Sequence, residues 1–151
     1  MKKLGKSSKK GFTLVELIVV LVILAVLAAM LVPALIGYID RARQEKEYQT
    51  AATVYGAAQA VLTELYAKDE LTDGQDTIET AQTLTSMGDA DAVLALAGVD
   101  ASAVTEYSFD FDTDTHIITG GTVVIGDATY TLTITDGVPS WQGAKTPAGE
   151  G

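Results

Sequence analysis

The chain has 151 residues, of which 20 are acidic and 10 basic, so its formal charge is −10 and its size allows one membrane helix and one small domain. An acidic surface repels phosphates and argues against nucleic-acid binding. The absence of cysteine excludes disulfides and thiolate metal sites, and a single histidine, His116, excludes a two-histidine zinc motif.

Residues 1–11 form a short basic segment that we interpret as a leader peptide. It holds five of the ten basic residues, so its removal would take the formal charge from −10 to −15. Basic residues before a first apolar segment stay in the cytoplasm, which places the acidic remainder outside. An ordinary secretory signal is the alternative, but Glu16 interrupts the apolar core that such a signal needs.

One long helix is predicted over residues 12–67. Residues 17–39 carry no charge and span about 35 Å as a helix, enough for a bilayer core of roughly 30 Å. We therefore expect residues 12–39 to form a transmembrane segment. Glu16 at its edge is costly there and indicates a function. Pro33 and Gly37 predict a helix kink or a loosened stretch, although membrane helices also tolerate both residues.

Residues 40–67 predict an amphipathic continuation of this helix. Apolar residues recur there at alternating spacings of three and four, and Gln49, Gln59 and Thr63 lie on the other face. A lone amphipathic helix is marginal, so later residues must cover the apolar stripe. The stripe consists of Tyr48, Ala51, Tyr55, Ala58, Leu62 and Leu65.

Residues 68–103 predict a helical connecting region. Two short helices are expected, over residues 77–87 and 89–97, with Asp89 as the N-cap of the second. Gly88 and Gly98 fit the ends of these helices.

An antiparallel sheet is predicted over residues 104–142, because apolar and polar residues alternate there. Strands are expected from Val104 and over residues 115–119, 122–125 and 129–135, with breaks at Gly120-Gly121 and Gly126-Asp127. Trp141 is expected to cover the core, and residues 143–151 to form a flexible tail. The fold class is α+β, a long N-terminal helix packed against a small sheet.

The remaining candidate sites are weak. Asp110, Asp112 and Asp114 begin like a calcium loop, but Thr115 and Gly121 stand where that loop needs a glycine and a glutamate. A solvated row of carboxylates is the better interpretation. Counting alone does not exclude a Ser-His-Asp triad, but no nucleophile elbow is present. We expect no enzyme activity, no catalytic residue, no cofactor and no metal.

The segment Lys10-Gly11-Phe12-Thr13-Leu14-Val15-Glu16-Leu17 resembles the processing site of type IV prepilins and pseudopilins. A basic leader ends in Gly11, Phe12 follows the presumed cut, Glu16 is the fifth residue after it, and Pro33 lies inside the apolar helix. The resemblance implies a pilin-like fold. The lack of a C-terminal disulfide loop favours a Gram-positive or anaerobic source, or a subgroup that closes its domain differently. The small domain and the intact Glu16 favour a major pilin, so we expect a Gram-positive-like major pilin.

What this resemblance implies is a subunit stored in the cytoplasmic membrane with its N-terminus in the cytoplasm. A prepilin peptidase/N-methyltransferase would cut after Gly11 and methylate the amine of Phe12. Glu16 would pair with the Phe12 amine of a neighbouring copy in a helical homopolymer. An inner-membrane assembly platform and its ATPase would extend this filament onto the cell surface.

Two alternatives stay open. The first is a pseudopilin of a type II secretion or DNA-uptake system, which would form a short piston instead of a surface fibre. The second is a single-pass membrane protein with an extracytoplasmic binding domain, which would keep its leader lysines.

Overall fold

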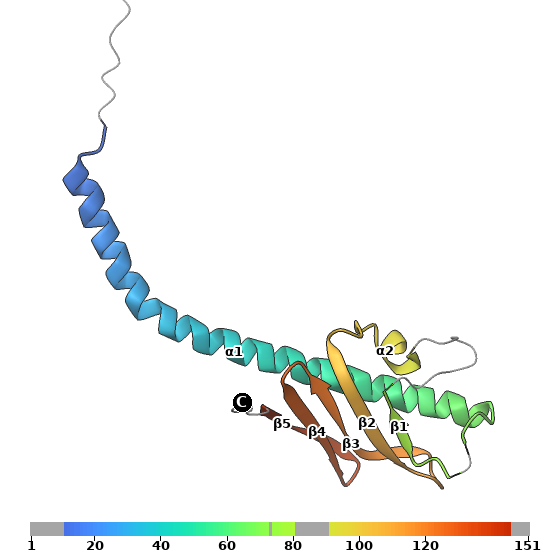
Figure 1. Cartoon of the computed structure of the whole chain (residues 1–151). Coiled ribbons are helices and arrows are strands. Elements are labelled where there is room, and N and C mark those ends of the chain that lie inside the picture. Colours follow the sequence, from blue (N-terminus) through green and yellow to red (C-terminus); the bar gives the residue numbers. More distant parts are fainter. Residues whose placement is uncertain (1–10, 73, 81–90, 146–151) are drawn as a thin grey trace, which may run out of the picture. The chain divides into compact units, whose positions relative to one another are not determined.

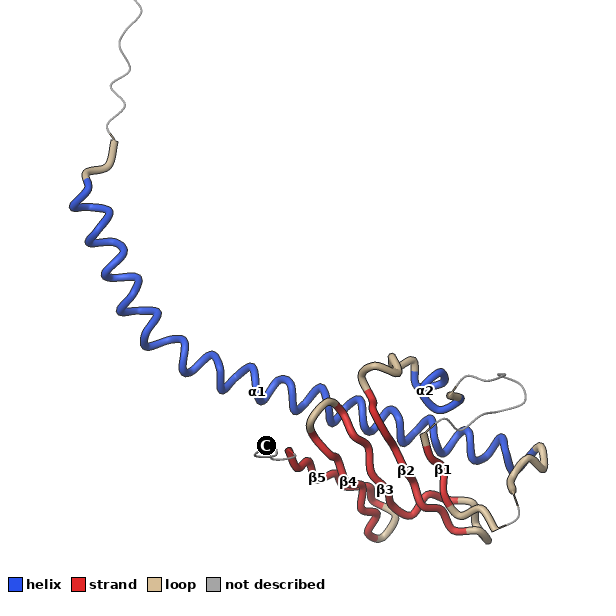
Figure 2. The backbone as a smooth tube through the Cα atoms, in the orientation of Figure 1, coloured by secondary structure: helices blue, strands red, loops and turns tan. Residues whose placement is uncertain are grey.

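The computed structural model describes residues 11–72, 74–80 and 91–145. Its elements follow one another along the chain as two helices and five strands, drawn in Figure 2. The chain divides into two compact units, Met1–Arg43 and Gln44–Gly151. The elements are α1 (Leu14–Ala67), β1 (Thr77–Glu79), α2 (Ala92–Ala97), β2 (Val104–Asp112), β3 (Ile117–Ile125), β4 (Ala128–Thr135) and β5 (Val138–Lys145).

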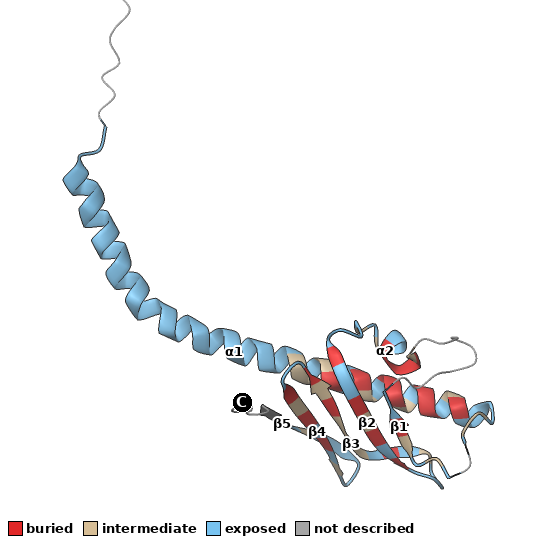
Figure 3. Ribbon diagram, in the orientation of Figure 1, coloured by how far each residue is buried: buried red, intermediate tan, exposed pale blue. Residues whose placement is uncertain are grey.

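The first unit contains the N-terminal part of α1. The predicted long helix is confirmed, although it begins at Leu14 and not at Phe12. Every described side chain of this unit is exposed, as the uniform pale blue in Figure 3 shows. Because apolar side chains are exposed all around the helix, this part of α1 has no hydrophobic core of its own chain.

The second unit joins the C-terminal part of α1 to a five-stranded antiparallel sheet in the order β1-β2-β3-β4-β5. Figure 1 shows this part of α1 running across the strands. Each strand pairs with its neighbour in sequence, as short connections favour. The α+β fold with a helix packed against a small antiparallel sheet is therefore confirmed.

The core of this unit lies between α1 and one face of the sheet. The predicted stripe is confirmed, since its alanines and leucines are buried and Tyr48 and Tyr55 are half-buried. Trp141 is half-buried against the core and meets the Tyr55 ring edge-on at 6.4 Å. The remaining buried residues of α1 are Val54, Ala57 and Val61, and the sheet contributes Tyr107, Phe109, Val123, Tyr130 and Leu132 among others.

Polar side chains also join α1 to the sheet. The Tyr130 hydroxyl donates to a carboxylate oxygen of Glu47, and the Gly143 N–H donates to the Tyr48 hydroxyl at 3.1 Å. Gln59 was expected on the polar face, but it is half-buried and binds the backbone at the start of β3. Its amide donates to the His116 carbonyl at 2.9 Å and accepts from the Ile118 N–H at 2.8 Å.

The helix predicted over residues 77–87 is wrong at its start, because Thr77–Glu79 is strand β1. Ile78 lies opposite Phe109 and is fully buried, so tertiary packing overrides local helix propensity. The rest of that prediction, with Gly88 and Asp89, lies outside the described residues. The second helix is confirmed in shorter form as α2. Its N-cap is Asp91, and Gly98 ends it in the left-handed conformation.

The break predicted at Gly120-Gly121 is also wrong. Strand β3 runs through both glycines, and residues 115 and 116 belong to the preceding turn. Gly121 lies opposite Phe109, where a Cβ atom would come within 2.4 Å of the Ser108 carbonyl oxygen. Glycine is needed there for close approach of two strands and a phenyl ring.

Residues 143–145 are part of β5 and not of a flexible tail. The two-residue turn Asp136-Gly137 joins β4 to β5 with positive φ at both positions, 53° and 77°. An Asp-Gly pair between alternating residues is a strong hairpin signal. The sequence therefore contained the information for this strand. The division of the chain into the six predicted segments stays a prediction.

Candidate processing and assembly site

The N-terminus of α1 is closed by a reciprocal pair of hydrogen bonds. The Thr13 N–H donates to Glu16 Oε2 at 2.8 Å, and the Glu16 N–H donates to Thr13 Oγ1 at 3.3 Å. This is a capping box, in which Thr13 is the N-cap and Glu16 the third helical residue. Sequence analysis missed the role of Thr13, although a Thr followed three residues later by Glu before an apolar run is its signature.

The capping box leaves part of Glu16 available. In the part of the chain that the structure describes, only its Oε2 atom accepts a hydrogen bond, and the side chain is exposed. A carboxylate has about four lone-pair sites. Glu16 can therefore keep its own helix capped and still bind a cationic group from another molecule.

The presumed scissile bond lies directly before this cap. Gly11 and Phe12 are both exposed and precede the first helical residue, and the Phe12 side chain is 84% exposed. A Cβ atom built on Gly11 would meet nothing within 4 Å. The subunit itself thus gives no steric reason for glycine, so any requirement for it lies in a partner such as a peptidase.

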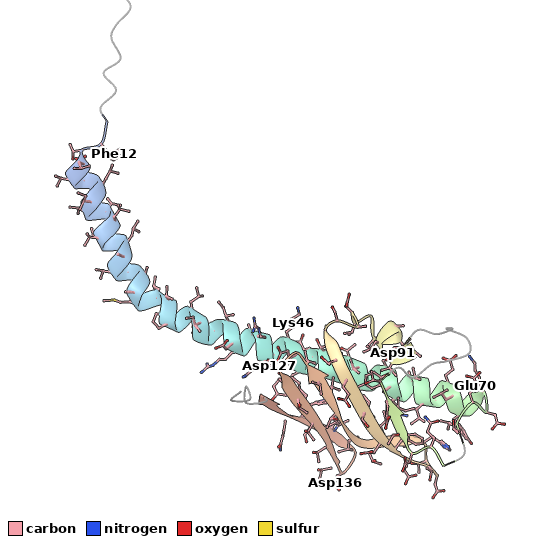
Figure 4. The ribbon with its side chains drawn as sticks, in the orientation of Figure 1. Phe12, Lys46, Glu70, Asp91, Asp127 and Asp136 are labelled. Carbon is pink, nitrogen blue, oxygen red and sulfur yellow. The ribbon has the colours of Figure 1, made fainter. Side chains whose placement is uncertain are left out.

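Apolar side chains surround α1 immediately after Glu16. Among the described residues one helix, α1, is long and apolar enough to cross a membrane. Its large apolar side chains between Leu17 and Ile39 are each at least half exposed. Helix α1 continues through Pro33 and Gly37. The kink expected at these two residues stays a prediction. Figure 4 labels Phe12 at the beginning of this stretch.

The three aspartates considered as calcium ligands do not form a common site. Asp112 Oδ1 accepts from the Thr115 N–H and hydroxyl at 2.8 Å each, and from the Asp114 N–H at 3.1 Å. These bonds, above all that from the Thr115 backbone, lower the pKa of Asp112 below its ordinary value. Nowhere in the described ranges do three His, Cys, Asp or Glu side chains gather as metal ligands would.

His116 and Asp91 have structural contacts. The His116 ring stacks on Tyr66 with centroids 3.9 Å apart. Asp91 accepts from the Leu94 N–H at 2.9 Å and from the Tyr107 hydroxyl at 2.8 Å, which ties the start of α2 to β2. Both side chains therefore have structural contacts within the second unit.

Comparison with known proteins identifies one family model. The model of the prokaryotic N-terminal methylation motif matches residues 6–32, which include Gly11, Phe12 and Glu16. No curated protein and no solved structure matches the chain significantly. The resemblance seen in residues 10–17 is thereby confirmed. The N-terminal part of this chain carries the prokaryotic N-terminal methylation motif, which is typical of type IV pilin-like proteins.

Proposed function

We propose that this protein is a structural subunit of a type IV pilus-like filament, cut after Gly11 and methylated on the amine of Phe12. The observation that carries this proposal is the position of Glu16. Among the described residues only one oxygen of its carboxylate accepts a hydrogen bond, and it lies one helical turn after an exposed Gly-Phe bond, at the start of an apolar helix. The matched methylation motif covers the same residues.

The exposed apolar surface of α1 supports two successive environments for the subunit. Side chains that are apolar on all sides of a helix require either lipid or other helices around them. Lipid would surround residues 17–39 in the stored subunit. In the filament, copies of the same helix would replace the lipid, with packing and, outside the membrane, burial worth roughly 25 cal/mol per Å².

Charge pairing would set the register between copies. Cleavage after Gly11 creates a positive amine on Phe12, and methylation keeps that charge. At about 4 Å and an intermediate effective dielectric constant, such an amine and a carboxylate attract by about 4 kcal/mol. We infer that Glu16 of one copy receives the Phe12 amine of its neighbour, while each Glu16 keeps its own cap on Thr13.

The partners follow from this sequence of steps. A prepilin peptidase/N-methyltransferase processes the subunit, and a membrane assembly platform with its ATPase lifts it into a cell-surface fibre. A pseudopilin that forms a short secretion or DNA-uptake piston is the second candidate, because the matched motif is common to both kinds of subunit. Visible long fibres distinguish the major pilin from the pseudopilin.

Two substitutions separate the charge of Glu16 from its capping role. Glu16→Gln removes the charge, but glutamine also serves in a capping box. Thr13→Ala removes the cap at a cost of about 1 kcal/mol and leaves the charge. Both variants should be processed in cells, as mass spectrometry of a chain beginning with methylated Phe12 would show.

Filaments sheared from cells give the decisive measurement. We expect Glu16→Gln to abolish or strongly reduce them and Thr13→Ala to retain most of them. Normal filaments built only from the Glu16→Gln variant would refute the pairing. A wild-type chain that still begins at Met1 and stays in the membrane would instead indicate the third candidate, a single-pass protein with a binding domain outside the membrane.

A further inference from the structure

A hollow of about 230 Å³ lies on one face of α1, where the uncharged stretch ends. Four residues line it, Ala34, Gly37, Tyr38 and Arg41. Their spacings of three, four and seven place them on the same side of the helix. All four belong to the first compact unit, and this hollow is independent of the capping box at Glu16.

Gly37 lines the hollow without contributing a side chain to it. Glycine is, after proline, the least favourable residue in a helix interior. A Cβ atom at this position would meet no heavy atom within 4 Å, so no contact of this chain requires the glycine. Absence of a side chain here leaves room for a ligand to lie against the helix.

Arg41 provides a cation at the rim of the hollow. It is exposed and makes no ion pair, because the single ion pair within the described ranges joins Lys68 to Glu64. A guanidinium group presents five N–H donors in a plane that fits the oxygens of a phosphate. Arg41 is thus an unused donor beside an open space.

The depth of this site in a membrane follows from the sequence. Arg41 comes two residues after the last residue of the uncharged stretch, Ile39, or about 3 Å further along the helix. Tyr38 is 71% exposed, and tyrosine is enriched at the level of lipid headgroups. Along the helix, apolar side chains are thus followed by an interfacial aromatic ring and then by a cation. A phospholipid has the matching order, from its apolar chains to its charged phosphate.

We propose that this hollow binds the phosphodiester of an anionic phospholipid while the subunit is stored in the membrane. Arg41 donates to the phosphate oxygens, the Tyr38 hydroxyl donates from the rim, and the glycerol end lies over Gly37. The inference rests on the membrane-stored subunit of the proposed function. The competing occupant is a carboxylate of a second copy, since the chain carries twice as many acidic as basic residues.

The chain offers a sharp spectroscopic test, because Arg41 and Arg43 are its only arginines. Arg43 lies about 200° further around the helix and does not line the hollow. The full-length chain, labelled with ¹⁵N-arginine, is reconstituted in bilayers of phosphatidylcholine and phosphatidylglycerol. Arg43→Lys then leaves a signal from Arg41 alone, and Arg41→Lys leaves one from Arg43 alone.

Solid-state NMR measures the dipolar coupling between the guanidinium nitrogens and lipid phosphorus. We expect strong coupling for Arg41 and weak coupling for Arg43. Gly37→Leu, which fills the hollow but keeps Arg41, should weaken the Arg41 coupling. Native mass spectrometry should show about fivefold less phosphatidylglycerol retained by Arg41→Ala than by Arg43→Ala, as expected for about 1 kcal/mol.

Three results would overturn the inference. The first is equal coupling of both arginines, and the second is unchanged coupling in Gly37→Leu. The third is that millimolar inorganic phosphate in detergent displaces the lipid equally from Arg41→Ala and Arg43→Ala. Coupling of the Arg41 guanidinium to ¹³C-labelled carboxylates of a second copy, in place of phosphorus, would assign the site to a subunit contact. A chain that fails to enter the bilayer would refute the membrane-stored subunit itself.

Discussion

The link between Tyr130 and Glu47 makes a quantitative prediction about the contact between α1 and the sheet. Tyr130 is 2% exposed, and its hydroxyl donates to the Glu47 carboxylate. Hydrogen bonds to a charged group contribute about 1.5–3 kcal/mol. Tyr130→Phe removes the hydroxyl and retains the ring that meets Tyr48 edge-on at 5.0 Å. We expect the free energy of unfolding to fall by about 1.5–3 kcal/mol.

Urea unfolding of the full-length chain in detergent measures this loss. The single tryptophan, Trp141, reports on the transition because it is half-buried beside Tyr55. Tyr66→Phe is the matched control, since Tyr66 is 58% exposed and should change stability by less than about 0.5 kcal/mol. Glu47→Gln completes a double-mutant cycle with Tyr130→Phe. A coupling energy near zero would refute the reasoning.

The same hydroxyl predicts a loss of stability at alkaline pH. Burial, followed by the Glu47 contact, raises the pKa of Tyr130 above its ordinary value of 10.0. Above pH ~10 the unfolded chain therefore releases the Tyr130 proton before the folded chain does. Above pH ~10 the free energy of unfolding should therefore fall by about 1.4 kcal/mol per pH unit because of this proton. Below pH ~10 the stabilisation by the Tyr130 hydroxyl is fully present. Equal slopes between pH 10 and 11 for wild type and Tyr130→Phe would contradict this prediction.

The remaining predictions concern packing and are checked by the same unfolding measurement. Leu62→Ala, at a fully buried position of α1, should cost about 2–5 kcal/mol through lost burial and a cavity. Gly121→Ala should be severely destabilising because its Cβ would lie 2.4 Å from a carbonyl oxygen of β2. Gly120→Ala is the control and should be mild, since its nearest contact is at 3.5 Å. A similar loss of unfolding free energy in both variants would show that β3 shifts easily. Gln59→Leu should cost about 1–3 kcal/mol by leaving the His116 carbonyl before β3 and the Ile118 N–H of β3 unpaired. An unchanged midpoint would show that water replaces the amide.

Local signals were sufficient for the N-terminal part of the chain. The methylation motif and the apolar helix depend on residues close together in sequence, and the matched family model covers residues 6–32 of this part. The alternation of Tyr107, Phe109 and Phe111 likewise predicted β2, because a half-buried strand has a side-chain period of two. Thr13 and the Asp136-Gly137 turn carried equally local signals that sequence analysis did not use.

Other features required the tertiary structure, since their cause lies far along the chain. Thr77–Glu79 forms a strand because Ile78 is buried opposite Phe109, about thirty residues later. Gly120 and Gly121 read as a turn by composition, but an approaching strand and the ring of Phe109 make them part of β3. Gln59 has a polar side chain on an amphipathic helix, yet it pairs with the His116 carbonyl before β3 and the Ile118 N–H of β3.

The sequence by itself determined that this protein has an apolar N-terminal helix that carries the methylation motif, followed by an acidic region. Helix periodicity, charge and motif spacing are properties of neighbouring residues, which the chain carries before it folds. The tertiary structure decided which face of α1 is covered and how the five strands are ordered. Those features depend on contacts between distant residues, and such contacts are defined only when the hydrophobic surfaces have packed together.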